Sequence, residues 1–178
     1  MKNEETQIAI DRFRKRVIKE SRANLTKLKK NSSKTLYDSL RGVSRVNKNS
    51  ISLYFEMEEY GEFQDKGVNG VGPATNDKNG NPRTVVKNGK YSYNNKMPPT
   101  KALDKWIVKK GIAPKDKNGK FISRQSLKFA IARSIFQNGI KPSLFFTKPF
   151  EKAFKSLPDE LVEAYGLDII ETFISRKK

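Results

Sequence analysis

The side chains best suited to chemistry in this sequence are five carboxylates that lie close together: Glu56, Glu58, Glu59, Glu62 and Asp65. Glu56 and Glu58 are two residues apart in a segment with strand-like alternation, so their side chains are expected on one face. Such a pair can hold a divalent metal ion or carry out acid–base catalysis if further ligands lie nearby. We interpret the pair instead as the solvent face of an amphipathic strand, and the cluster as a candidate contact with a neighbouring subunit.

Histidine and cysteine are both absent from the 178 residues, which excludes several classes of site. A thiolate nucleophile, a cysteine-ligated zinc site or a disulfide framework cannot be built without cysteine. Without histidine there is no imidazole for a catalytic triad or for a general base with an ordinary pKa near neutrality. Carboxylate-based hydrolysis and magnesium sites need only Asp and Glu and remain open, with a carboxylate-metal nuclease as the enzyme alternative. Because the glutamate pair is interpreted as a solvent face, we expect a protein that is not an enzyme and that uses no metal ion and no cofactor.

Glycine-rich segments do not match the nucleotide-binding patterns. Gly67, Gly70 and Gly72 lie close together, but no Lys-Ser or Lys-Thr pair follows them at the start of a helix, as a phosphate-binding loop requires. Residues 77–81 and 116–120 resemble the beginning of a calcium-binding loop, but lysines intrude and the closing glutamate is missing. Both segments are interpreted as turns.

The chain carries a large excess of positive charge. Lysine and arginine number 37 against 19 acidic residues, for a formal net charge of +18. Residues 12–30 hold nine bases and one acid, whereas residues 51–100 are neutral overall. This segregation indicates contact with nucleic acid or head-to-tail contact between copies, and a merely solvated surface is the alternative. The candidate bases for DNA or for an acidic partner are Arg16, Arg22, Lys27, Lys29 and Lys30.

Hydrophobic spacing predicts the elements that position these groups. Apolar residues recur at helical intervals over 6–41, which predicts one long amphipathic helix. Residues 31–33 are a weak point for a bend or a restart of this helix, with Ser33 as the candidate N-cap. Alternation over 50–58 predicts a strand, with 43–46 as its partner, so strands are expected within 43–66.

The turn-rich segment 67–97 contains three Asn-Gly pairs, which favour hairpins. Residues 84–86 and 91–93 are expected to pair across one of these turns. A hairpin this polar cannot fold alone, and we therefore expect it to protrude and to contact another chain. A flexible surface loop is the alternative. Tyr91 and Tyr93 are the candidate contact residues.

Residues 98–178 are expected to be mainly helical, within a single domain that covers 1–178. Trp106 lies on the apolar side of a predicted helix, which indicates a core residue. Phe145 and Phe146 are adjacent in an extended segment, so we expect one to be buried and the other to pack on a neighbouring element.

Three short motifs stand in order along the chain. The first is YGEFQDKG at 60–67 after a strand; the second is LDKWIVKKGI at 103–112, followed by FAIARSI at 129–135; the third is FFTKPF at 145–150, before a helix. Over about 6–174, with 67–97 enlarged, the chain resembles the head–tail connector, or tail-completion, family of minor structural proteins of tailed bacteriophages.

The resemblance implies an α+β fold: a long N-terminal helix packed on a small, mostly antiparallel β-sheet, with further C-terminal helices. It implies a homo-oligomeric ring in the neck of the virion, around the DNA channel, assembled in the host bacterial cytoplasm. The implied partners are the chain itself and other neck, portal or tail proteins, with DNA as a further partner through nonspecific electrostatics and with no membrane. The alternative is a free, sequence-nonspecific nucleic-acid-binding protein.

Overall fold

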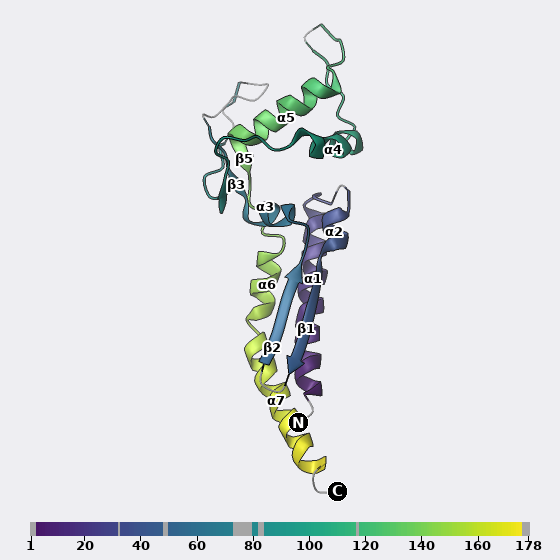
Figure 1. Cartoon of the computed structure of the whole chain (residues 1–178), viewed down its shortest axis with the longest axis vertical. Coiled ribbons are helices and arrows are strands. Elements are labelled where there is room, and N and C mark those ends of the chain that lie inside the picture. Colours follow the sequence, from purple (N-terminus) through teal and green to yellow (C-terminus); the bar gives the residue numbers. More distant parts are fainter. Residues whose placement is uncertain are drawn as a thin grey trace. The chain divides into compact units, whose positions relative to one another are not determined.

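The computed structural model describes residues 3–31, 33–47, 50–72, 80–81, 84–116 and 118–175 (Figure 1). Contacts within the chain divide it into two compact units. Unit 1 is formed by Met1–Glu58 together with Phe145–Lys178, and unit 2 by Glu59–Leu144. The sequence predicted one domain, because hydrophobic periodicity carries no sign that one unit is inserted into another.

Unit 1 has the predicted α+β composition, with helices packed on an antiparallel strand pair: α1 (Glu4–Lys27), β1 (Arg41–Asn47), β2 (Ser50–Glu56), α6 (Thr147–Phe154) and α7 (Leu157–Ser175). In the register of the pair, Arg41 lies opposite Glu56 and Val46 opposite Ile51. The expected strand pair is therefore confirmed, and the turn at 48–49 lies outside the described residues.

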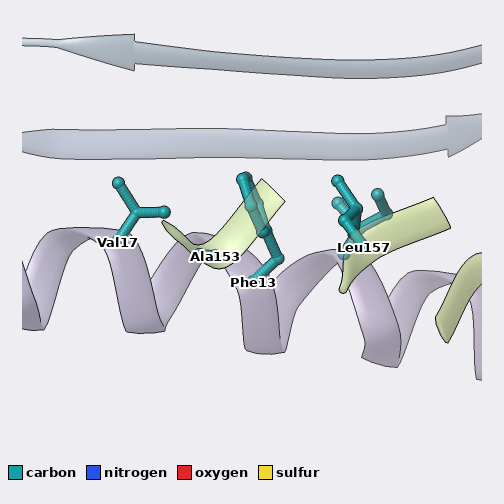
Figure 2. Close-up of a cluster of buried hydrophobic side chains, with 5 residues drawn as sticks. Phe13, Val17, Ala153 and Leu157 are labelled. Carbon is teal, nitrogen blue, oxygen red and sulfur yellow. The ribbon is translucent and has the colours of Figure 1, made fainter. Parts of the chain in front are cut away.

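The core of unit 1 is formed where α1, α6 and α7 meet the strands, and its buried members are Ile10, Phe13, Val17, Ala153 and Leu157. Figure 2 shows Phe13 and Val17 extending from α1 toward the two strands. The ring of Phe13 meets Phe150 edge to face, with the ring centroids 5.6 Å apart. The helical spacing seen in the sequence thus becomes the buried face of α1.

The first helix ends at Lys27, so the prediction of one helix over 6–41 is wrong. Lys29 adopts a left-handed backbone conformation with φ of 52°. The N–H of Lys30 then donates to the carbonyl of Leu25 at 2.9 Å, the six-to-one bond of a Schellman motif. This motif usually has glycine at the left-handed position, and a lysine there gives no signal of a helix end.

A short helix, α2 (Thr35–Ser39), follows the break. Leu36 of α2 packs with Leu25 and Phe145 in a second buried cluster of unit 1. Phe145 is fully buried, and Phe146 packs against both clusters, as expected for adjacent residues with different surroundings.

Asp168 of α7 is fully buried at the N-terminus of α1. Its carboxylate accepts hydrogen bonds from the backbone N–H groups of Glu5 and Thr6, each at 3.0 Å, and from the Thr6 hydroxyl at 2.6 Å. A negative charge at this end is favoured by the helix dipole and satisfies N–H groups that have no partner within the helix. The N-terminus of α1 is therefore capped by a residue far away in the sequence.

Unit 2 combines helices with three two-residue strands: α3 (Tyr60–Lys66), β3 (Val68–Asn69), β4 (Tyr91–Ser92), a 3₁₀ turn (Thr100–Ala102), α4 (Leu103–Lys109), α5 (Arg124–Asn138) and β5 (Gly139–Ile140). The side chain of Ser123 accepts from the N–H of Ser126 and caps α5. Residues 60–66, expected among strands, are helical instead. Ile107 is buried, whereas Trp106 is 37% exposed, so the assignment of Trp106 to the core is wrong.

The predicted hairpin of 84–86 with 91–93 is also wrong. Tyr91–Ser92 pairs in parallel with Val68–Asn69, and Val68–Asn69 pairs antiparallel with Gly139–Ile140. Parallel pairing needs a long connection, and the turn-rich segment supplies it.

The described residues of 67–97 pack within unit 2 and do not all protrude from it. Val86 is buried, and its N–H donates to the carbonyl of Asn138 at 2.8 Å. Its carbonyl accepts from the N–H of Gly70 at 3.1 Å. Residues 73–79 and 82–83 lie outside the described part of the chain.

Candidate interaction surfaces

The acidic residues that the sequence grouped together have different surroundings. Glu56 is exposed and pairs with Arg41 across the strand pair. Glu58 and Glu59 are exposed, whereas Asp65 is buried. No group of three or more acidic residues that could hold a metal ion occurs in the described part of the chain. The interpretation of Glu56 and Glu58 as a solvent-facing pair agrees with their exposure.

Glu62 belongs to a cluster within unit 2 that also contains Lys90 and Tyr91. The Lys90 ammonium donates to the Glu62 carboxylate at 3.0 Å. Hydrogen bonds from Tyr91 and then Lys90 hold the pKa of Glu62 below its ordinary value, and the same bond to Glu62 raises the pKa of Tyr91. The Tyr91 ring meets Phe63 edge to face at 4.8 Å. Glu62 and Tyr91, two candidate subunit contacts, thus contact each other.

Tyr93 also contacts its own unit. Its ring lies 5.8 Å from that of Phe136 in α5, and burial raises the pKa of its hydroxyl. The tyrosines proposed to reach another chain therefore hold the segment 90–93 against unit 2.

Two of the candidate bases have partners within unit 1. Arg16 pairs with Glu20 one turn along α1, at 3.3 Å. The Arg22 guanidinium lies over the ring of Tyr37, 5.0 Å from its centroid, and donates to the carbonyls of Tyr37 and Leu40, each at 3.0 Å. It therefore satisfies carbonyl groups at the end of α2, which is a structural role.

The other candidate bases lie at the end of α1. Lys27 and Lys29 are exposed, and Lys29 forms the left-handed end of the helix described above. Lys30 is partly buried, and this burial lowers the pKa of its ammonium.

A shallow groove on the outer side of α1 brings several bases around an apolar floor. Its lining residues are Lys15, Ile18, Lys19, Arg22, Ala23, Thr26, Lys27 and Tyr37. The groove has a volume of about 740 Å³. Lys19 and Lys27 make no ion pair with any residue that the structure describes. The grouping of Tyr37 with the bases of α1 was not predicted from the sequence, because Tyr37 reaches the groove from a segment that was assigned to the same helix.

The last helix exposes a large amount of apolar surface. Val162 is 75% exposed and Ile170 is 55% exposed, and Tyr165 and Leu167 are close to half exposed. α7 is apolar around most of its circumference, so one apolar side remains in solvent. No helix among the described residues is both long and apolar enough to cross a membrane.

No protein-family model, curated protein or solved structure matches this chain.

Proposed function

We propose that this chain is a structural virion protein of a tailed bacteriophage, which forms an oligomeric ring in the neck, as a head–tail connector or tail-completion protein, around the DNA channel. The observation that carries the proposal is the solvent-exposed apolar side of α7. Side chains such as Val162, 75% exposed, are stabilised when another protein removes them from water. A subunit of a larger assembly meets that requirement.

The function is mechanical: the ring joins its neighbours and surrounds the DNA path. The basic side of α1 supports this role, because bases such as Lys19 and Lys27 attract either DNA phosphates or an acidic neighbouring ring. Contacts of this kind with phosphate carry no base preference, which suits DNA that must pass through the channel.

A free nucleic-acid-binding protein is the second candidate, and the groove of α1 is the observation that favours it. It has bases on its rim and an aromatic residue, Tyr37, in its lining. Single-stranded nucleic acid is commonly bound by such a combination. Arg22, however, already covers the Tyr37 ring, which reduces the face available for stacking with a base.

The test is to look for the chain in purified virions. Tailed phage particles whose genome encodes the chain are purified by density gradient, and their proteins are quantified by mass spectrometry relative to the portal protein. We expect several copies per particle, and we expect cryo-electron microscopy to locate them at the neck. Particles of full infectivity that lack the chain would contradict the proposal and favour the free nucleic-acid-binding protein.

A further inference from the structure

The outward side of α7 combines acidic and apolar residues in one stripe: Asp159, Val162, Glu163, Gly166 and Ile170. Steps of three and four residues place them on one side of the helix, opposite the buried Ala164 and Asp168. The whole of α7 carries five acidic residues and no base.

Gly166 is the small residue at the centre of this stripe. A Cβ added there would meet no atom of the described chain within 4 Å. Glycine within a helix costs about 0.5–1 kcal/mol relative to alanine, and among the described residues no close approach to the Cβ position requires glycine here. A glycine on an exposed helix face does allow the backbone of another helix to approach closely.

The groove on α1 has the complementary character. Its rim carries Lys15, Lys19, Arg22 and Lys27, and its floor includes Ile18 and Ala23. An acidic helix with an apolar stripe matches both the rim and the floor. A polyphosphate backbone would match the rim alone and would leave the apolar floor and α7 uncovered.

One copy cannot make this contact with itself. Asp168 of α7 lies against Thr6 at the start of α1, whereas the groove is formed by the last turns of α1 and by Tyr37. Figure 1 shows α2 and the C-terminal part of α7 at opposite ends of α1, within unit 1. The stripe therefore has to meet the groove of another molecule.

We propose that the outward stripe of α7 docks in the basic groove of α1 on a second copy of this chain. The proposal rests on the proposed function and specifies its subunit interface. The contact is head to tail, because one copy contributes the α7 stripe and the other contributes the α1 groove. Repetition of such a contact closes a ring when the rotation between copies divides a full turn.

The experiment measures self-association by sedimentation velocity over a concentration series of the full chain. The groove variant is Lys15→Glu with Lys19→Glu, and the stripe variant is Val162→Gln with Ile170→Gln, which removes the apolar contact without adding charge. All four side chains are partly or largely exposed, so both variants are expected to fold with an unchanged circular dichroism spectrum. We expect each variant to raise the apparent dissociation constant at least about 10-fold, because the groove variant sets acids against the acidic stripe and the stripe variant replaces its apolar side chains with polar amides.

Two control variants change the same kinds of side chain elsewhere. Lys96→Glu with Lys101→Glu reverses the same charge in unit 2, and Val108→Gln replaces an apolar residue that is 58% exposed. Both are expected to associate like the wild-type chain.

Mixing the two interface variants gives the sharpest test. A head-to-tail contact leaves one intact stripe and one intact groove in the mixture, so a 1:1 mixture forms a heterodimer and nothing larger. A symmetric contact that uses the same patch on both copies gives no such rescue and overturns the proposal.

Other results also overturn the proposal and remain distinct from a failure of the proposed function. If the wild-type chain associates and both variants associate equally well, the interface lies elsewhere, and the virion assay still decides the ring role. If the wild-type chain stays monomeric, the α7–groove interface is rejected. If the groove variant then loses affinity for duplex DNA relative to the Lys96→Glu, Lys101→Glu control, the groove is a nucleic-acid site.

Discussion

Asp168 is a buried carboxylate whose charge is stabilised by the start of another helix. Burial alone would raise the pKa of this carboxyl, but hydrogen bonds from the Thr6 side chain and from the backbone N–H groups of residues 4–6 together hold the pKa below its ordinary value. The ionised form of Asp168 is therefore more favoured in the folded state than in the unfolded chain. The attachment of α7 to α1 therefore depends on pH.

The first prediction concerns Asp168→Asn, which removes the charge and places an amide donor among backbone donors. We expect the free energy of unfolding at pH 7 to fall by about 1–3 kcal/mol, measured by urea denaturation. Because the pKa of the folded state is depressed, the contribution of Asp168 is full above the unfolded pKa of about 3.9 and is lost as the pH falls through the folded value. The gap between wild type and variant should therefore begin to narrow near pH 4 and close only when the pH has fallen through the folded pKa.

Glu163→Gln is the matched control, since Glu163 is an exposed acid of the same helix. Its effect should stay within about 0.5 kcal/mol for the monomer. An Asp168→Asn protein as stable as wild type at pH 7 would show that the carboxylate does not hold α7 in place.

At the scale of the elements, unit 2 depends on close contacts between backbones. A Cβ on Gly70 would lie 2.2 Å from the carbonyl oxygen of Gln137, and one on Gly139 would lie 2.3 Å from that of Val68. Gly139 also has a φ of 82°, which residues other than glycine rarely adopt. The glycine-rich segment thus serves to bring β3 against the end of α5.

The second prediction concerns Gly70→Ala. The added methyl group meets backbone atoms that cannot rotate away, so we expect unit 2 to lose about 1–3 kcal/mol of stability. Gly166→Ala is the opposite case, because its Cβ enters open space within a helix, and it should stabilise unit 1 by about 0.5–1 kcal/mol. Hydrogen exchange, read separately for α5 and α1, measures both. Equal protection of α5 in Gly70→Ala and wild type would contradict this account.

The sequence predicted elements where a local period sets the structure, and failed where distant contacts set it. Alternation over 50–58 identified the strand, and the spacing of Phe13 and Val17 identified the buried face of α1. The helix end at Lys29 carries neither glycine nor proline, so the sequence indicated only a weak point at 31–33 and not the end itself. The parallel pair of Tyr91–Ser92 with Val68–Asn69 is too short for any periodicity to appear.

The candidate sites were predicted less well than the fold, for the same reason. Spacing alone grouped Glu62 with the other acids, but its neighbours are Lys90 and Tyr91, which are distant in the sequence. The groove could be anticipated only as a basic helix, because its floor depends on Tyr37 folding back against Arg22.

At the scale of the whole molecule, unit 2 is an insertion between the two parts of unit 1. The chain enters unit 2 at α3 and leaves it after β5, and these two points are adjacent within unit 2. The N–H of Ser143 donates to the carbonyl of Gln64, and that of Leu144 to the carbonyl of Asp65, at 3.1 and 3.0 Å. Unit 2 therefore brings its own two ends together.

This insertion determines the order in which the two units can fold during synthesis on the ribosome. The hairpin and α1 emerge first, but their core lacks Ala153 and Leu157 until the final segment has been synthesised. Unit 2 is continuous, so it can fold while that segment is still in the exit tunnel, and its paired ends then shorten the loop that α6 and α7 must close. We expect pulse-labelled hydrogen exchange during refolding to protect the amides of α5 before those of α1. Protection of α1 first would show that unit 1 folds before unit 2 and would contradict this order.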